Sequence, residues 1–256
     1  MPKPRARARG RDVGGMKYAI LSDIHGNLEA LTAVLADVDA RHPDAVFCLG
    51  DFVGYGPDPN ACVARLRPIL AGAVAGNHDL AALGDLDISV FNPLAQAAIL
   101  WTREQMTPET RAFLRSLPER IERDGFVAVH GSMRDPIEEY IFEASTAEES
   151  FRAGAFHVCA VGHTHVPAVF THQSDGVRAG VLAPEHLLHL DPATRYILNV
   201  GSVGQPRDGD PRAAYVWLED DTARLLRIDY PLARTQEKMI AAGLPPALAE
   251  RLAYGR

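Results

Sequence analysis

Five short apolar segments in the first two thirds of the chain each end in a cluster of polar residues, and this repetition narrows the possible folds more than any other feature. The segments are Lys17–Leu21, Ala45–Leu49, Ile69–Ala75, Phe126–Val129 and Phe156–Val161. Their length and apolar character are typical of buried strands. Strands alternate with predicted helices in the first half of the chain, which indicates an α/β fold.

The predicted helices follow from apolar residues at helical spacing and from their capping signals. They cover Asn27–Arg41, about 60–66, about 92–117 with a break at Pro108, 146–152 with a Thr146–Glu149 capping pattern, and about 232–252 with a break at Pro245-Pro246. Short β-rich runs fill the second half: Val166–His172, His186–Leu190, Tyr196–Val200, Ala213–Leu218 and Ala223–Tyr230. No repeat or linker interrupts the pattern, so we expect one domain over residues 16–256.

Residues 1–15 are basic, contain Pro and Gly, and are almost free of large apolar side chains. We expect them to form a disordered extension. A nucleic-acid-binding arm is one interpretation. The alternative we favour is that Met16 marks the real start of the folded unit, or even of translation.

The charge balance argues against nucleic acid as a partner of the remaining chain. The formal net charge is −7, whereas a grip on a phosphate backbone needs a basic surface. A small phosphorylated substrate is compatible with this charge, because bound divalent cations reverse the local field. No apolar run approaches the roughly 18 residues of a membrane span, so we expect no membrane partner.

The three cysteines, Cys48, Cys62 and Cys159, show no metal-binding spacing. Cys48 and Cys159 lie inside apolar strand-like runs, which predicts buried free thiols. Free thiols are typical of a reducing compartment, so we expect a cytoplasmic protein.

The polar clusters at the strand ends carry the chemistry. Asp23 and His25 are two residues apart, so at a strand end their side chains would leave the same face. Sites in α/β sheets form beyond the carboxyl ends of strands. Brought together, the five clusters supply carboxylates, an amide oxygen and at least four imidazoles. This set suits ions of the Mn, Fe, Zn or Co kind better than Mg or Ca, which prefer oxygen ligands. Taken singly, each cluster has a structural interpretation as a turn, a cap or a strand-end histidine.

The clusters resemble the motif set of the calcineurin-like metallophosphoesterases, and the match spans residues 17 to about 206. In order, the motifs are Asp23-x-His25, Gly50-Asp51, Gly76-Asn77-His78-Asp79, His130 and Gly162-His163-Thr164-His165. The resemblance implies a four-layer α-β-β-α sandwich, in which two mixed sheets are flanked by helices. It also implies two divalent transition-metal ions, with Mn²⁺ expected and Fe, Zn, Ni or Co as alternatives. The first ion would be held by Asp23, His25, Asp51 and His165, and the second by Asp51, Asn77, His130 and His163.

The resemblance further implies hydrolysis of phosphate esters by a metal-bridging hydroxide, with His78 as the general acid and Asp79 as the carboxylate that orients it. Asn77, Tyr55 and Arg207 are the expected substrate contacts. For Tyr55 the alternative is an exposed aromatic residue in a turn. Arg207 lies in a glycine-rich segment, residues 201–208, that would cradle a phosphate.

Two positions indicate which branch of the family this chain resembles. Protein phosphatases carry Asp-Arg where this chain has Gly54-Tyr55, and their third motif ends in Glu where this chain has Asp79. Compact bacterial phosphodiesterases fit better, with a small, nucleotide-like phosphodiester as the expected substrate. The alternatives are a phosphomonoesterase, a protein or nucleotide phosphatase, and a non-catalytic scaffold with the same fold. The scaffold members lack the histidine at the position of His78. A homo-oligomer is left open.

Overall fold

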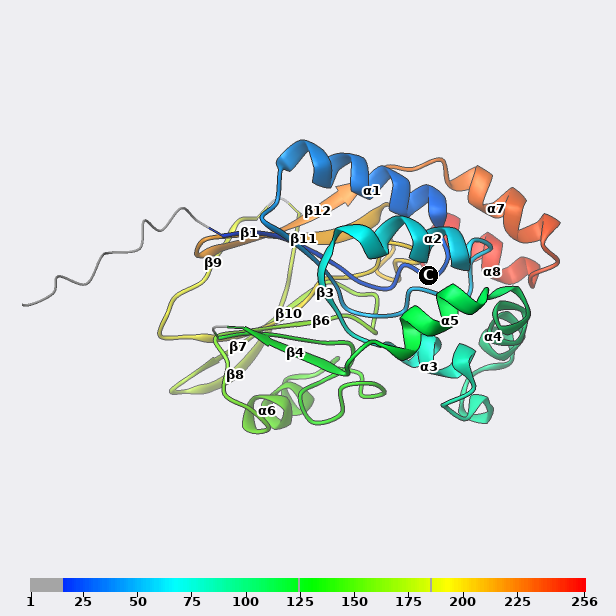
Figure 1. Ribbon diagram of the computed structural model, residues 1–256. Helices are drawn as coiled ribbons and strands as arrows, with labels where there is room; N and C mark the ends of the chain where they lie inside the picture. The colour runs from blue at the N-terminus through cyan, green and yellow to red at the C-terminus, as the bar shows by residue number, and fades with distance from the viewer. Residues whose placement is uncertain (1–15, 124, 185) are drawn as a thin grey trace, which may run out of the picture.

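Two mixed six-stranded sheets stack face to face in the computed structural model (Figure 1). The first sheet has the order β3 (Leu70–Ala73), β2 (Ala45–Cys48), β1 (Lys17–Leu21), β11 (Ala213–Glu219), β12 (Thr222–Ile228) and β9 (Leu188–His189). The second has the order β4 (Arg120–Arg123), β5 (Phe126–Val129), β6 (Val158–Val161), β10 (Arg195–Asn199), β7 (Ala168–Gln173) and β8 (Gly176–Val181). In each sheet three neighbouring strands run parallel: β1, β2 and β3 in the first, and β5, β6 and β10 in the second.

Helices cover both outer faces of the stacked sheets, which confirms the predicted four layers (Figure 1). Helices α1 (Leu28–Arg41) and α2 (Pro59–Leu66) lie over the first sheet, and α6 (Ala144–Arg152) lies beyond the second. The remaining helices gather at one end: α3 (Asn77–Leu83), α4 (Pro93–Gln105), α5 (Pro108–Arg115), α7 (Leu232–Ala241) and α8 (Pro246–Glu250). Three 3₁₀ turns complete the described elements: η1 (Arg67–Ile69), η2 (Ile88–Val90) and η3 (Arg251–Tyr254).

Successive side chains of a strand point to opposite faces of its sheet, and this alternation determines which residues enter each part of the core. In β1, Ala19 and Leu21 pack against the helices, whereas Ile20 points into the space between the sheets. There it joins Phe47 of the first sheet and Phe126 of the second, in one cluster that both sheets share. Because both faces of the central strands are buried, their sequences read as continuous apolar runs.

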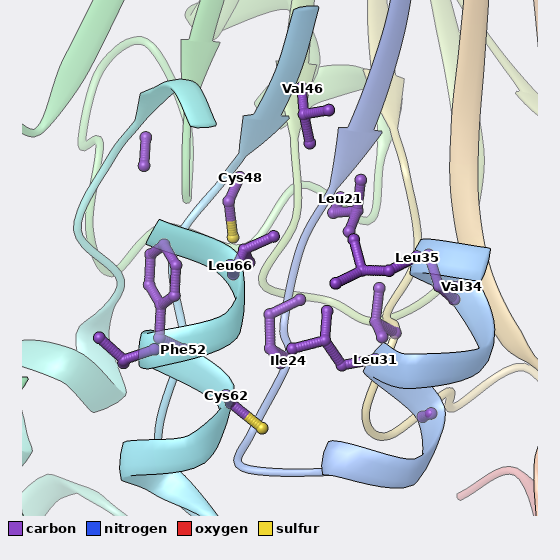
Figure 2. Packing of buried hydrophobic residues seen from close by; sticks show 14 of the residues in the cluster. Leu21, Ile24, Leu31, Val34, Leu35, Val46, Cys48, Phe52, Cys62 and Leu66 are labelled. Atoms are coloured by element: carbon purple, nitrogen blue, oxygen red, sulfur yellow. The ribbon is translucent and has the colours of Figure 1, made fainter. Parts of the chain in front are cut away.

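The contact between the first sheet and its helices begins immediately after β1. Asn27 caps α1, since its side-chain oxygen accepts the backbone N–H of Ala30 at 3.1 Å. The apolar face of α1 then lies on Leu21 and Ile24, and Leu31 is among the side chains that it contributes (Figure 2). This packing fixes the position of residues 22–27, which connect β1 to α1.

Most predicted elements are present with small shifts of their ends, but four details differ. Strand β8, Gly176–Val181, was not predicted. The predicted Thr146–Glu149 cap is wrong, because α6 begins at Ala144 and Glu143 precedes it without a side-chain cap. Strand β4 was not predicted because its sequence, Arg-Ile-Glu-Arg, is mostly charged and exposed. Helix α3 was not predicted because its first residues are those of a polar motif, which hides a helix start.

The structure describes residues 16–123, 125–184 and 186–256. The expectation of a disordered basic extension at residues 1–15 lies outside the described residues. Within the described part, no helix is long and apolar enough to cross a membrane. The three cysteines are free and buried, as predicted for Cys48 and Cys159.

Leu31→Ala should destabilise the protein by about 2–5 kcal/mol, because it leaves a cavity beneath α1. The matched control is Leu100→Ala in α4, whose side chain is 47% exposed and should cost no more than about 0.5 kcal/mol. Urea unfolding of both variants at one metal concentration makes the comparison. Equal losses would contradict the packing described for α1.

Candidate metal centre

The carboxyl ends of the parallel strands from both sheets meet at one place. The chain after β1 supplies Asp23 and His25, and the chain after β2 supplies Asp51. The chain after β6 supplies His163, whose backbone N–H donates to Asp23 Oδ2 at 3.1 Å across the two sheets. The shared edge predicted from the strand ends is therefore present in the structure.

A first group of ligand atoms comes from Asp23, His25, Asp51 and His165, all buried and within 4.8 Å of one another. His165 Nε2 lies 3.2 Å from Asp23 Oδ1 and 3.1 Å from His25 Nε2. His25 Nε2 lies 3.5 Å from Asp51 Oδ2. These are the four residues expected at the first ion.

A second group surrounds His130 Nε2. This nitrogen lies 3.2 Å from Asn77 Oδ1, 3.0 Å from His163 Nδ1 and 3.5 Å from Asp51 Oδ2. Asp51 Oδ2 is thus 3.5 Å from an imidazole nitrogen of each group. The carboxylate lies between the two groups, as a bridging ligand would.

Backbone carbonyls hold the second ring nitrogen of all four imidazoles. The contacts are His25 Nδ1 to Val53 O at 3.1 Å, His130 Nδ1 to Leu49 O at 2.8 Å, His163 Nε2 to Glu138 O at 3.0 Å, and His165 Nδ1 to Gln205 O at 2.6 Å. A carbonyl only accepts hydrogen bonds, so these ring nitrogens carry the proton. The nitrogen that points to the centre then presents a lone pair, as a metal ligand must.

The buried charges and lone pairs of the centre fit a divalent cation. Burial lowers the pKa of His25 and His163 well below the usual value and that of His165 to about 4, so these rings are neutral. Two neutral rings therefore direct lone pairs at each other across 3.1 Å in the pair His25–His165. Asp23 Oδ1 is buried without a hydrogen-bond donor. A cation bound among these atoms would remove both unfavourable features, the facing lone pairs and the carboxylate oxygen without a donor.

The two carboxylates differ in their electrostatic setting. Burial raises the pKa of Asp51, and the charge of Asp23 raises it further. Burial also acts to raise the pKa of Asp23, whereas a proton on the neighbouring His165, His130 or His25 acts to lower it. Asp51 is therefore the group that gains most from a cation, which would keep it ionised.

Backbone strain is concentrated at the ligands. Asp23, His25, Asp51, His163 and His165 have positive φ angles of 53°, 47°, 53°, 64° and 61°. This left-handed region costs a non-glycine residue about 1 kcal/mol or more. Strain of this kind persists where the surrounding structure holds it and is typical of functional sites.

Two motif glycines allow the close approach of the ligand loops. A Cβ at Gly76 would lie 2.1 Å from Asp51 Oδ1, and one at Gly162 would lie 1.9 Å from Ser22 Oγ. Any side chain at either position would force the loops apart. The glycines in Gly76-Asn77 and Gly162-His163 are thus required by packing.

A cavity of about 470 Å³ opens beside the centre. Asn77, His78 and His163 line it. The His78 ring is buried between Tyr55 and Phe91, with ring centroids 4.4 and 5.1 Å away, and its Nδ1 has no hydrogen-bond partner. His78 is thus placed next to the ligand groups, on the wall of the cavity.

Comparison with known proteins agrees with this geometry. The profile of the calcineurin-like phosphoesterase superfamily domain matches residues 16–222. The chain belongs to this superfamily. It is 39% identical to the uncharacterized protein MJ0912 of Methanocaldococcus jannaschii, over 93% of this chain and 98% of that protein.

Solved structures extend the comparison. A crystal structure of a metallophosphoesterase from Sphaerobacter thermophilus is 43% identical, with a TM-score of 0.84 over 94% of this chain and all of that chain. Protein PH1004 from Pyrococcus horikoshii shares the fold at 18% identity, with a TM-score of 0.76 over 94% of this chain and 99% of that chain. The protein is a metallophosphoesterase, a hydrolase of phosphoester bonds, with a buried Asp/His cluster for metal.

One expected contact of the phosphoesterase site is wrong. Asp79 does not orient His78: its carboxylate oxygens accept the backbone N–H groups of Val53 at 3.2 Å and Gly76 at 3.1 Å. Burial raises the pKa of Asp79 to about 8, with the charge of Asp51 as the next cause. Asp79 instead ties the loop after β2 to the start of α3.

The expected substrate contacts all line the cavity. Tyr55 is 5% exposed, which rules out the exposed-turn alternative, and Arg207 joins Asn77 on the wall. Further lining residues were not found from the sequence, among them Phe91, Tyr140 and Arg251. They come from segments outside the motifs, and no spacing in the sequence links them to the site.

Asp51→Asn should remove most of the thermal stabilisation that metal gives, because the residue faces both groups. For wild-type protein freed of metal, Mn²⁺ at about 100 times its Kd should add roughly 2.7 kcal/mol, or at least about 5 °C in Tm. Differential scanning fluorimetry compares this shift in Asp51→Asn and in the exposed control Asp39→Asn. A full shift in Asp51→Asn would contradict its place between the groups.

Proposed function

We propose that the protein hydrolyses phosphate esters, preferentially phosphodiesters, with two divalent ions bound at the shared centre. The observation that carries this proposal is Asp51 Oδ2, which lies 3.5 Å from an imidazole of each ligand group. Two separate groups joined by one carboxylate are the arrangement that a two-ion site requires.

The donor set favours Mn²⁺, with Fe, Zn, Ni and Co as alternatives. Four imidazoles, two carboxylates and one amide oxygen form a mixed nitrogen and oxygen shell, which suits borderline ions. When bound, two such ions supply Lewis-acid stabilisation of the phosphoryl oxygens and activation of a water. The three buried free cysteines support a reducing, cytoplasmic location.

His78 is the group of this chain best placed to move a proton. It lines the cavity and is not among the atoms that form the two ligand groups. Burial lowers its pKa, and the charge of Arg207 lowers it further, so the ring is neutral in the free protein. A bound phosphate ester brings negative charge that raises this pKa. The ring would then take up a proton on substrate binding and donate it to the leaving oxygen.

The walls of the cavity support a diester with an aromatic group, such as a nucleotide-like substrate. Tyr140 stacks on His163 with ring centroids 3.7 Å apart and an interplanar angle of 13°, and its side chain is 44% exposed. Tyr140 also stacks with Phe142, with ring centroids 5.6 Å apart and an interplanar angle of 14°, so a partly exposed aromatic surface lies next to a ligand of the centre. Stacking on aromatic side chains contributes about 1–3 kcal/mol per base in nucleic-acid complexes.

Purified protein should hydrolyse bis-p-nitrophenyl phosphate after metal is added, most rapidly with Mn²⁺. The assay compares Mn²⁺, Ni²⁺, Fe²⁺, Zn²⁺ and Mg²⁺, and includes phosphomonoesters and cyclic nucleotides as competing substrates. Circular dichroism verifies the fold of the sample. No turnover by the folded protein with any metal would favour the non-catalytic scaffold, and faster monoester hydrolysis would favour a phosphatase.

His78→Ala should keep the metal content and reduce turnover by about 100-fold or more when the leaving group is an alkoxide, because such an oxygen needs a proton. The loss should be much smaller with p-nitrophenolate, which leaves unprotonated. Metal analysis and leaving-group series provide the two measurements, and the exposed His186→Ala is the matched control. Equal losses for both leaving groups would exclude proton donation by His78.

A further inference from the structure

Two arginines from separate parts of the chain meet at the cavity. Arg207 follows the last strand-end loop, and its backbone N–H donates to the carbonyl of His165 at 3.2 Å. Arg251 begins η3, well beyond residue 222, where the match to the superfamily profile ends. Both line the cavity.

The two guanidinium groups are held side by side. Both lie over the Tyr55 ring, 5.7 Å from its centroid for Arg207 and 4.8 Å for Arg251. Both also donate to the same acceptor, Gln205 Oε1, with a distance of 2.9 Å for Arg207 Nη2. An aromatic ring and one neutral amide oxygen thus position two like charges.

Neither arginine forms an ion pair within the described ranges, although the charge of Arg207 reaches Asp51 and acts to lower its pKa. The Nε of each arginine is buried without a hydrogen-bond partner. Burial lowers the pKa of Arg251, and the charge of Arg207 lowers it further. Paired guanidinium groups on the wall of a cavity are suited to bind an anion with two or more oxygens.

We propose that Arg251, together with Arg207, binds a second anionic group of the substrate, separate from the phosphate that is cleaved. The proposal rests on the proposed phosphodiesterase function. The cleaved phosphate must reach the ligand groups, whereas Arg251 is held over the Tyr55 ring by the C-terminal turn η3. The preferred substrates are then diesters that carry a further phosphate.

A matched pair of substrates tests this preference. The pair is thymidine 5′-(p-nitrophenyl phosphate) and the same diester with an added 3′-phosphate, and nitrophenol release gives kcat/KM for each. Wild-type protein should prefer the phosphorylated diester by about tenfold or more, as expected for charge-assisted hydrogen bonds. Arg251→Gln should reduce this ratio by about tenfold, and Arg251→Lys by less. Arg224→Gln, at an exposed position on β12, is the matched control and should keep the ratio.

A ratio that is the same in wild-type protein and Arg251→Gln would overturn the proposal and leave Arg251 a packing role against Tyr55. A second measurement does not depend on turnover. Calorimetric titration of metal-free protein with inorganic phosphate at low salt should show about tenfold weaker binding for Arg251→Gln than for Arg224→Gln. If neither diester is hydrolysed, the proposed function fails, while weaker phosphate binding by Arg251→Gln alone still supports the anion site. Equal phosphate binding by both variants would overturn it.

Discussion

The packing of the two sheets against each other is the constraint on which the metal centre depends. The ligands come from loops after strands of both sheets, so their spacing is set by how Ile20, Phe47 and Phe126 interlock between the sheets. The bond from the His163 backbone to Asp23 Oδ2, at 3.1 Å, crosses this interface at the centre itself. Interiors are close-packed and transmit strain, so a shift of one sheet would move one ligand group relative to the other.

The same packing also offsets the local cost of the site. Several ligands have left-handed backbone conformations, and Asp23 Oδ1 is buried without a donor. Each feature is unfavourable alone. They are compatible with a stable fold because the ligand loops start at buried strands and because Gly76 and Gly162 let them approach closely. The centre is therefore preorganised by the protein and gains stability when a cation enters.

The four layers were predicted through the family that the motifs resemble, and the motifs themselves contain the four residues that cluster as the first ligand group, because each motif follows its own strand. Asp23 and His165 lie far apart in the sequence, yet each is marked by its own strand. The role of Asp79 was not predictable in this way, since whether it meets His78 or a backbone N–H depends on the paths of two loops. Tyr140 and Arg251 carry no motif, and only the folded chain brings them to the cavity.

The residues that would carry out the reaction and the residues that would select the substrate therefore come from different parts of the chain. The ligands belong to the core that the family profile covers, whereas Arg251 lies outside it. A chain with a net charge of −7 does not attract an anionic substrate over distances beyond the Debye length, about 8 Å at physiological salt. Recognition of such a substrate must come from short-range contacts within the cavity. The arginine pair over Tyr55 provides positive charge at that range, so substrate choice would be set by the residues beside the metal centre, including the C-terminal turn that carries Arg251, rather than by the centre itself.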